Sequence, residues 1–126
     1  MTDDRRERGL EVRKEVLGPA HVERAMANAT SFTEEFQDLL TRYAWGEIWA
    51  RPGLDRRTRS CITLAMLAAL GHSEELKLHL RGALNNGLTM DEIKEVLLQS
   101  AIYAGIPAAN TAFRVAAEFL ASEPGV

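Results

Sequence analysis

The sequence predicts an all-α fold, a compact helical bundle of about six to seven helices in one domain spanning residues 1–126. Apolar residues recur three and four positions apart along most of the chain, and no run argues for a sheet. Glycine and proline pairs separate the periodic segments, so short connections are expected. At 46% hydrophobic, a chain of this length can bury a core without disulfides or metal. Residues 1–4 and 122–126 are expected to fray.

The first half of the chain predicts three helical segments. A helix is expected over about residues 3–17, ended by Gly18-Pro19, and a short helical turn over about residues 20–26. Residues 31–34 have the Ser-x-x-Glu pattern of a capping box, which opens the third helix. The apolar residues of that helix are Phe36, Leu39, Leu40 and Tyr43.

The middle of the chain predicts an unusually apolar helix. A Trp-rich segment over residues 44–50 ends at Pro52-Gly53, and Asp55 is placed to cap the helix that then runs to Leu70-Gly71. Thr63 is its only polar residue between positions 61 and 70. A helix that is apolar on all sides is normally buried on all sides. We therefore expect a central helix, or one partly covered by another subunit.

The last third predicts three more helices. Ser73 begins the first, and Gly87 caps its C-terminus. Residues 89–92 form a second capping-box pattern, Thr-x-x-Glu, before the next helix. A break at residues 105–107 leads into the final helix, over about residues 107–121. The apolar stripe behind the capping box is Ile93, Val96, Leu97, Ala101 and Ala104.

Charge and cysteine usage exclude several classes of function. A net charge of −3 gives no basic field for nucleic acid. No apolar run reaches the ~18 residues of a membrane span, and the N-terminus lacks a signal-peptide core, so a cytoplasmic protein is expected. Cys61, the single cysteine, excludes an intrachain disulfide and a multi-thiolate metal site, and it is interpreted as a packing residue. No histidine or cysteine spacing indicates a metal site.

His79 is the most informative polar residue, because helical spacing places it on an apolar face with Leu76, Leu80 and Ala83. One interpretation is a core histidine whose ring nitrogens are satisfied by a carbonyl or a carboxylate. The other is a general acid/base or a donor to a substrate oxygen, since the unperturbed pKa of histidine lies near ~6.5.

An arginine cluster opens the apolar helix. Its members are Arg56, Arg57 and Arg59, with Arg51 just upstream. A helix N-terminus already carries about half a positive charge, so additional cations there are unfavourable unless an anion compensates them. That anion is either a protein carboxylate, such as Glu47, Asp55 or an interface acid, or the carboxylate of a substrate.

Glu47 lies between Trp45 and Trp49 in the sequence. Two large aromatic side chains beside it would desolvate the carboxyl and favour its protonated form, as a proton donor requires. The alternative is a solvated glutamate on a turn, with the two tryptophans as ordinary core residues.

Four segments together resemble the γ-carboxymuconolactone decarboxylase family, within the alkylhydroperoxidase D-like superfamily. They are residues 45–60, 62–70, 79–89 and 103–112, and the likeness extends from about residue 5 to residue 120. Redox members of that superfamily carry a CxxC ahead of a histidine that resembles His79. The corresponding positions here are His72 and Glu75, so the resemblance implies the decarboxylase branch and not a thiol-dependent peroxidase.

The resemblance implies a cofactor-independent decarboxylation of γ-carboxymuconolactone (4-carboxymuconolactone) to β-ketoadipate enol-lactone and CO2, in protocatechuate catabolism. It also implies a cytoplasmic homo-oligomer, a trimer or hexamer, with no nucleic acid and no membrane as partner. The substrate carries its own electron sink, so no cofactor is expected. Two alternatives stay open: a non-catalytic oligomeric module that binds carboxylates, and a paralogue of the same fold acting on a related lactone.

The chemistry then assigns roles. His79 is expected to be the donor to the lactone oxygen or the proton donor, with Glu47 as the other acid/base. The expected carboxylate anchors are Arg51, Arg57 and Arg59, and the expected pocket walls are Trp45, Trp49 and Tyr103.

Overall fold

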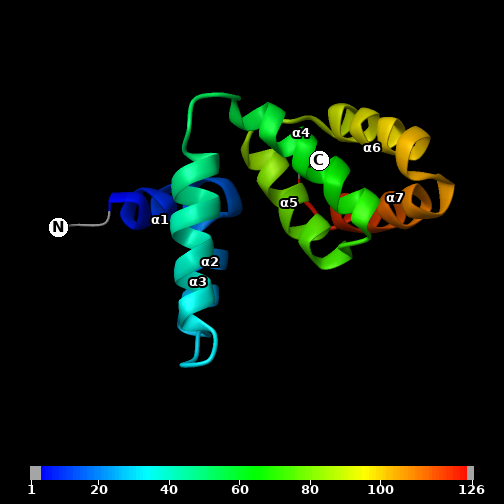
Figure 1. Ribbon diagram of the computed structural model, residues 1–126. Coiled ribbons are helices and arrows are strands. Elements are labelled where there is room, and N and C mark those ends of the chain that lie inside the picture. The colour runs from blue at the N-terminus through cyan, green and yellow to red at the C-terminus, as the bar shows by residue number, and fades with distance from the viewer. Residues whose placement is uncertain (1–3, 125–126) are drawn as a thin grey trace. The chain divides into compact units, whose positions relative to one another are not determined.

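The computed structural model describes residues 4–124, and within that range every regular element is a helix, as predicted (Figure 1). The chain divides into two compact units at residue 56. The ends expected to fray lie partly outside the described residues. Among the described residues, Glu123 forms an ion pair with Arg81. The start of the C-terminal tail is therefore held by the second unit.

The first unit contains α1 (Asp4–Leu17), α2 (Pro19–Ala27), α3 (Glu34–Leu40) and the π-helical segment η1 (Thr41–Trp49). The chain passes from α3 into η1 as one continuous helix, because the joining residue Thr41 keeps helical dihedral angles. The Trp-rich segment of residues 44–50 therefore belongs to the second half of a longer helix. π-Helical turns are rare and often mark functional sites.

Two glycines allow α1 and η1 to cross in backbone contact. A Cβ on Gly9 would lie 2.0 Å from the carbonyl oxygen of Thr41, and one on Gly46 would lie 2.2 Å from the carbonyl oxygen of Arg5. Since no side chain larger than hydrogen fits at either position, the crossing depends on both glycines. It fixes which residues of α1 lie beside η1.

The capping box expected at residues 31–34 is wrong. The helix begins at Glu34 with Thr33 as its N-cap, and no side chain caps it. Instead, the hydroxyl oxygen of Thr33 accepts a hydrogen bond from the backbone N–H of Thr30, while the N–H of Glu34 donates to the Thr30 carbonyl. These bonds close the turn locally and leave Ser31 exposed.

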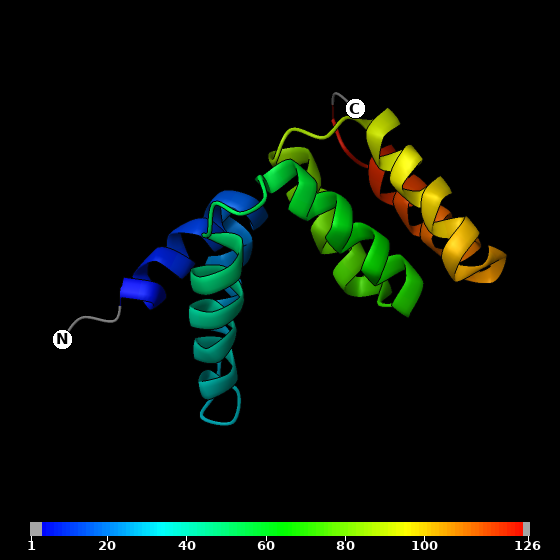
Figure 2. The ribbon, with the colours of Figure 1, turned by 45° about the horizontal axis from the view of Figure 1, so that its top comes forward.

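The second unit contains α4 (Arg56–Leu70), α5 (Ser73–Asn85), α6 (Met90–Ala104) and α7 (Ile106–Ala121). Helices α6 and α7 lie side by side in both views (Figures 1 and 2). The core of this unit draws on all four helices. Its largest fully buried side chains are Leu64, Leu76, Leu80, Ile93 and Leu97.

The capping box predicted at residues 89–92 is confirmed. The Thr89 hydroxyl accepts the backbone N–H of Glu92, and the Glu92 carboxylate accepts the N–H of Thr89. That second bond is the main cause that lowers the pKa of Glu92; desolvation opposes it, and the weaker attraction of Arg57 adds to the lowering. The start of α6 is therefore fixed by its own sequence.

Helix α4 is not buried on all sides, so the expectation of a central helix is wrong. Leu64 and Ala68 face the core, but Met66 is 58% exposed and Leu70 is 69% exposed. Helix α6 also exposes large apolar side chains, at Leu98, Ile102 and Tyr103. None of the helices within residues 4–124 is long and apolar enough to span a membrane.

Candidate active site

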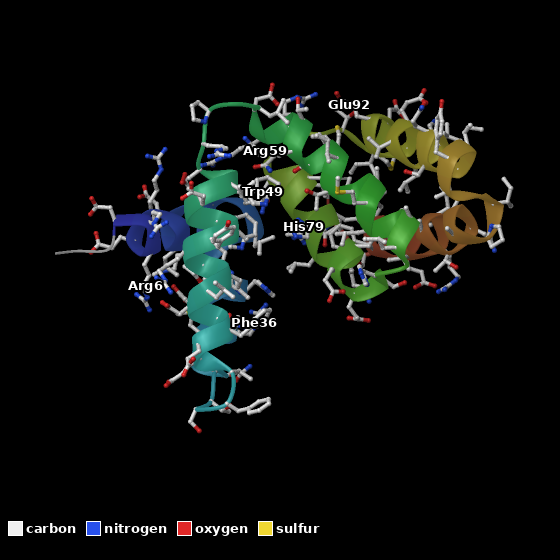
Figure 3. All side chains as sticks on the ribbon, viewed as in Figure 1. Arg6, Phe36, Trp49, Arg59, His79 and Glu92 are labelled. Atoms are coloured by element: carbon white, nitrogen blue, oxygen red, sulfur yellow. The ribbon has the colours of Figure 1, made fainter. Side chains whose placement is uncertain are left out.

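His79 lies in the middle of α5, at the edge of its buried face (Figure 3). Leu76, Leu80 and Ala83 on that face are fully buried, whereas His79 is half-buried. The predicted placement beside these three residues is therefore confirmed. A histidine in this position has an apolar wall on one side and access to the surface on the other, which suits both a core role and a proton-transfer role.

Glu47 lies in η1 but not between the indole rings. Trp45 and Trp49 stack on each other, with ring centroids 5.1 Å apart and planes inclined at 22°. Because Glu47 is two positions from each tryptophan, its side chain leaves the helix in another direction. Of the two interpretations of Glu47, the one in which two indole rings enclose the carboxyl does not fit this arrangement.

The groups that do flank Glu47 are guanidinium groups. Arg5 Nη1 lies 3.6 Å from Glu47 Oε2, and Arg51 Nη2 lies 3.6 Å from Glu47 Oε1. Arg8 donates a hydrogen bond of 2.9 Å to the carbonyl oxygen of Ala50, just beyond η1. A hollow of about 370 Å³ opens here. Its lining residues are Asp4, Arg5, Arg8, Gly46, Glu47, Ala50, Arg51 and Pro52.

Arg57 has structural partners in the second unit. Its guanidinium donates to the carbonyl oxygen of Gly87 and forms an ion pair with Glu92, so it joins the start of α4 to the capping box of α6. This is the protein-carboxylate alternative predicted for the cluster: the acid is Glu92 for Arg57, and it is Glu47, one of the acids expected, for Arg51. Arg56 likewise pairs with a carboxylate, that of Glu15, at 3.5 Å.

The remaining predicted residues also lie in the second unit. Arg59 is half-buried on α4, and its carbonyl oxygen accepts the Thr63 hydroxyl at 2.7 Å (Figure 3). Tyr103 is 84% exposed near the end of α6. The structure thus gathers Trp45, Glu47 and Arg51 on one short stretch of the first unit. The roles predicted for all of these residues remain predictions.

Arg5 and Arg8 are site-lining residues that sequence reasoning missed. The available signal was Gly9, a glycine inside a strongly charged helix, which often marks a close backbone approach. Nothing in the sequence shows which helix approaches it, and that partner decides which arginines lie beside Glu47.

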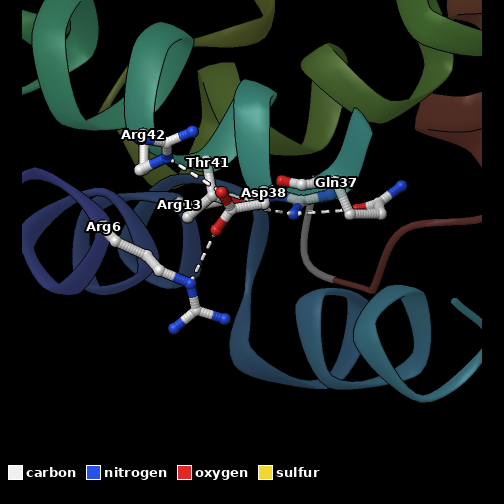
Figure 4. A network of polar contacts seen from close by, with 6 residues as sticks. All are labelled: Arg6, Arg13, Gln37, Asp38, Thr41 and Arg42. Carbon is white, nitrogen blue, oxygen red and sulfur yellow. Dashed lines mark hydrogen bonds and ion pairs between the residues drawn. The ribbon is translucent and has the colours of Figure 1, made fainter. Parts of the chain in front are cut away.

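A polar network fastens α1 to the helix formed by α3 and η1 (Figure 4). Asp38 pairs with Arg6 at 2.8 Å and with Arg42 at 2.9 Å. Arg13 is buried and donates to the side chains of Gln37 and Thr41, at 3.2 and 3.3 Å. Burial lowers the pKa of Arg13. The buried contacts of Arg13 hold the crossing that brings the N-terminal arginines to Glu47, whereas the Arg6–Asp38 pair is exposed.

Comparisons with known proteins give a consistent result. The sequence model of the carboxymuconolactone decarboxylase family matches residues 34–118, more than half of the chain. The 4-carboxymuconolactone decarboxylase of Acinetobacter baylyi is 52% identical over 119 residues, which cover 94% of this chain and 89% of that protein. The nitrosuccinic acid decarboxylase of Metarhizium robertsii is 52% identical over 99 residues, 79% of this chain and 69% of that protein.

Proposed function

The chain belongs to the carboxymuconolactone decarboxylase family, and we propose that it converts 4-carboxymuconolactone to β-ketoadipate enol-lactone and CO2. The observation that carries this proposal is the 52% identity to a 4-carboxymuconolactone decarboxylase across 94% of the chain. The reaction would belong to the protocatechuate branch of aromatic catabolism. A cytoplasmic location is part of the same proposal.

The substrate explains why the reaction needs no cofactor. Its ring carboxylate is carried by the carbon γ to the lactone carbonyl, and the C=C bond between that carbon and the carbonyl is conjugated with the carbonyl. When the C–CO2 bond breaks, its electron pair moves into that carbonyl and forms a 2-oxyfuran-like dienolate. Protonation of the ring carbon next to the carbonyl then gives the enol-lactone. The protein must anchor two carboxylates, stabilise the developing oxyanion and supply one proton.

We assign the donor role to His79. Its half-buried place on α5 supports this, because a donor beside an apolar wall interacts more strongly with a developing charge than one in water. Glu47 takes the other acid/base role. Its carboxyl oxygens lie 3.6 Å from guanidinium nitrogens of Arg5 and Arg51, so the group is held beside the hollow by two segments of the first unit.

Arg51 and Arg59 are the proposed carboxylate anchors, with Trp45, Trp49 and Tyr103 as pocket walls. Arg51 supports its role best, since its side chain is 52% exposed and lines the hollow beside Glu47. Arg57 keeps its proposed anchoring role only if it leaves Glu92 when the substrate binds.

The second relative favours a second candidate substrate, nitrosuccinic acid. This compound is also a dicarboxylate, and its nitro group accepts the electron pair released with CO2, as the lactone carbonyl does. Both substrates therefore require two carboxylate anchors and a hydrogen-bond donor to the group that accepts the electron pair. They differ in shape, because one is a ring and the other an open chain.

We propose that the protein is a homo-oligomer, a trimer or hexamer. The exposed apolar side chains of α4 and α6 support this, since monomeric proteins rarely leave such residues together in water.

The test is an assay of CO2 release from each compound, with loss of ultraviolet absorbance as a second readout for the lactone. We expect turnover of the lactone, a lower kcat/KM for nitrosuccinic acid, and strong loss of turnover in both His79→Gln and Glu47→Gln. If both variants keep near-normal turnover while folded, the site assignment is wrong. A wild-type protein that binds the lactone unchanged would be a non-catalytic carboxylate-binding module.

A further inference from the structure

The crossing of α1 over η1 places one residue of α1 beside Glu47. The backbone of Arg5 lies against Gly46, close enough that a Cβ on Gly46 would strike the Arg5 carbonyl oxygen. Glu47 follows Gly46 directly, so the side chain of Arg5 has little distance to cover. Its Nη1 reaches 3.6 Å from Glu47 Oε2.

Arg5 and Arg51 contact different oxygens of the same carboxylate. Arg51 approaches Oε1 from the bend just beyond η1, four residues after Glu47, and Arg5 approaches Oε2 from another helix. A single ion pair leaves a carboxylate free to rotate about its last C–C bond, whereas contacts on both oxygens restrict that rotation. Arg8 also joins α1 to the end of η1, through its hydrogen bond to Ala50. The two helices therefore do not depend on the Arg5–Glu47 contact alone to stay together.

We propose that Arg5 is a positioning residue that holds the carboxylate of Glu47 in its reactive orientation. This inference rests on the proposed function, in which Glu47 takes part in acid/base chemistry. Arg5 acts through Glu47 and does not touch the substrate. Loss of its guanidinium leaves Glu47 present but less well oriented, and misplacement of a reacting group by about 1 Å is able to cost ~10²-fold in rate.

The kinetic test compares Arg5→Gln with Arg6→Gln in the full chain, acting on 4-carboxymuconolactone. Arg6 is the matched control because it is an exposed arginine on the same helix that loses an ion pair, to Asp38, away from Glu47. We expect Arg5→Gln to lower kcat about tenfold or more with little change in KM. Arg5→Lys should restore most of the rate, and Arg6→Gln should stay within about twofold of wild type.

A double-mutant cycle separates positioning from general damage. In the Glu47→Gln background, Arg5→Gln should have little further effect, because the residue through which it acts is already lost. The proposal is overturned by an equal loss in both backgrounds, by an unchanged kcat in Arg5→Gln, or by a rise in KM alone. The last result would make Arg5 a substrate anchor.

A substrate-free measurement distinguishes failure of this inference from failure of the proposed function. In protein labelled with ¹³C at glutamate carboxyl groups, Arg5→Gln should move the Glu47 signal and Arg6→Gln should not. If the wild-type protein leaves the lactone intact but the Glu47 signal responds in this way, the proposed function is contradicted while the contact between Arg5 and Glu47 is supported. If the Glu47 resonance does not move in Arg5→Gln, the inference is overturned, whether or not the protein turns over the lactone.

Discussion

At the scale of the residue, His21 shows how burial and charge act together. It is half-buried on α2, and burial, followed by the nearby charges of Arg13 and Arg24, lowers its pKa from the ordinary value of 6.5. The unfolded chain then takes up a proton more readily than the folded chain. Protonation therefore favours unfolding, while at pH well above 6.5 the imidazole is neutral in both states and stability is unaffected.

We predict that the free energy of unfolding falls as the pH drops below about 6.5, and that His21→Gln reduces this loss. Urea unfolding of both proteins at pH 7.5 and 5.5 measures the change in the free energy of unfolding. His72→Gln is the control, because His72 is exposed. Equal pH dependence in wild type and His21→Gln would contradict the account. The sequence alone does not indicate this behaviour, because one of the charges that act on His21 belongs to Arg13 on another helix.

Individual site residues could be predicted from the sequence where one helix determines their surroundings. The place of His79 beside Leu76, Leu80 and Ala83 depends only on helical spacing, and it is confirmed. The surroundings of Glu47 depend on a second helix. Its neighbours in the sequence are tryptophans, but its neighbours in space are arginines, one of them 42 positions away.

At the scale of the element, the Thr89 capping box carries a measurable part of the stability of α6. Thr89→Ala removes the acceptor for the Glu92 N–H and should lower the free energy of unfolding by about 0.5–2 kcal/mol. Ser31→Ala is the matched control. Because Ser31 makes no cap in the structure, its replacement should change stability little. The reverse order of effects would restore the capping box predicted at residues 31–34.

The crossing of α1 and η1 gives a second prediction at this scale. Gly46→Ala forces a methyl group against the Arg5 backbone, so the two helices must separate. We expect a loss of about 1–3 kcal/mol or more in urea unfolding, and a similar loss for Gly9→Ala. Normal stability in both variants would mean that the helices do not cross in backbone contact.

Most helices could be predicted because glycine and proline mark their ends locally. Gly18, Gly87 and Gly105 have positive φ angles, which other residues rarely adopt, so the chain turns there in any context. The junction of α3 with η1 carries no such mark. A change from α-helical to π-helical geometry within one continuous helix leaves no signal in nine residues, so the sequence does not show where η1 begins.

At the scale of the whole molecule, the exposed apolar residues of α4 and α6 predict self-association. Ile102 is 75% exposed on α6, and Ile102→Glu should shift the protein toward a monomer of about 14 kDa in sedimentation experiments. Gln99→Glu is the control, since it places the same charge on the same helix at a position that is already polar. A wild-type monomer at micromolar concentration would contradict the prediction.

The all-α class could be predicted in full, because helical periodicity extends along the whole chain and composition excludes membrane-spanning segments. The degree of burial of α4 could not. An apolar sequence shows that a surface avoids water, but it does not show whether the same chain or another copy covers that surface. Leu64 and Met66, two positions apart on α4, illustrate the difference: the first is fully buried and the second is 58% exposed.

The most direct test of the central claim is CO2 release from 4-carboxymuconolactone by the purified protein and by His79→Gln, without added cofactor. The account predicts catalytic turnover by the wild type, formation of the enol-lactone, and a loss of about 10²-fold or more in kcat for a folded His79→Gln. A wild-type protein that leaves the lactone intact, or a His79→Gln variant that turns it over at the wild-type rate, would contradict it.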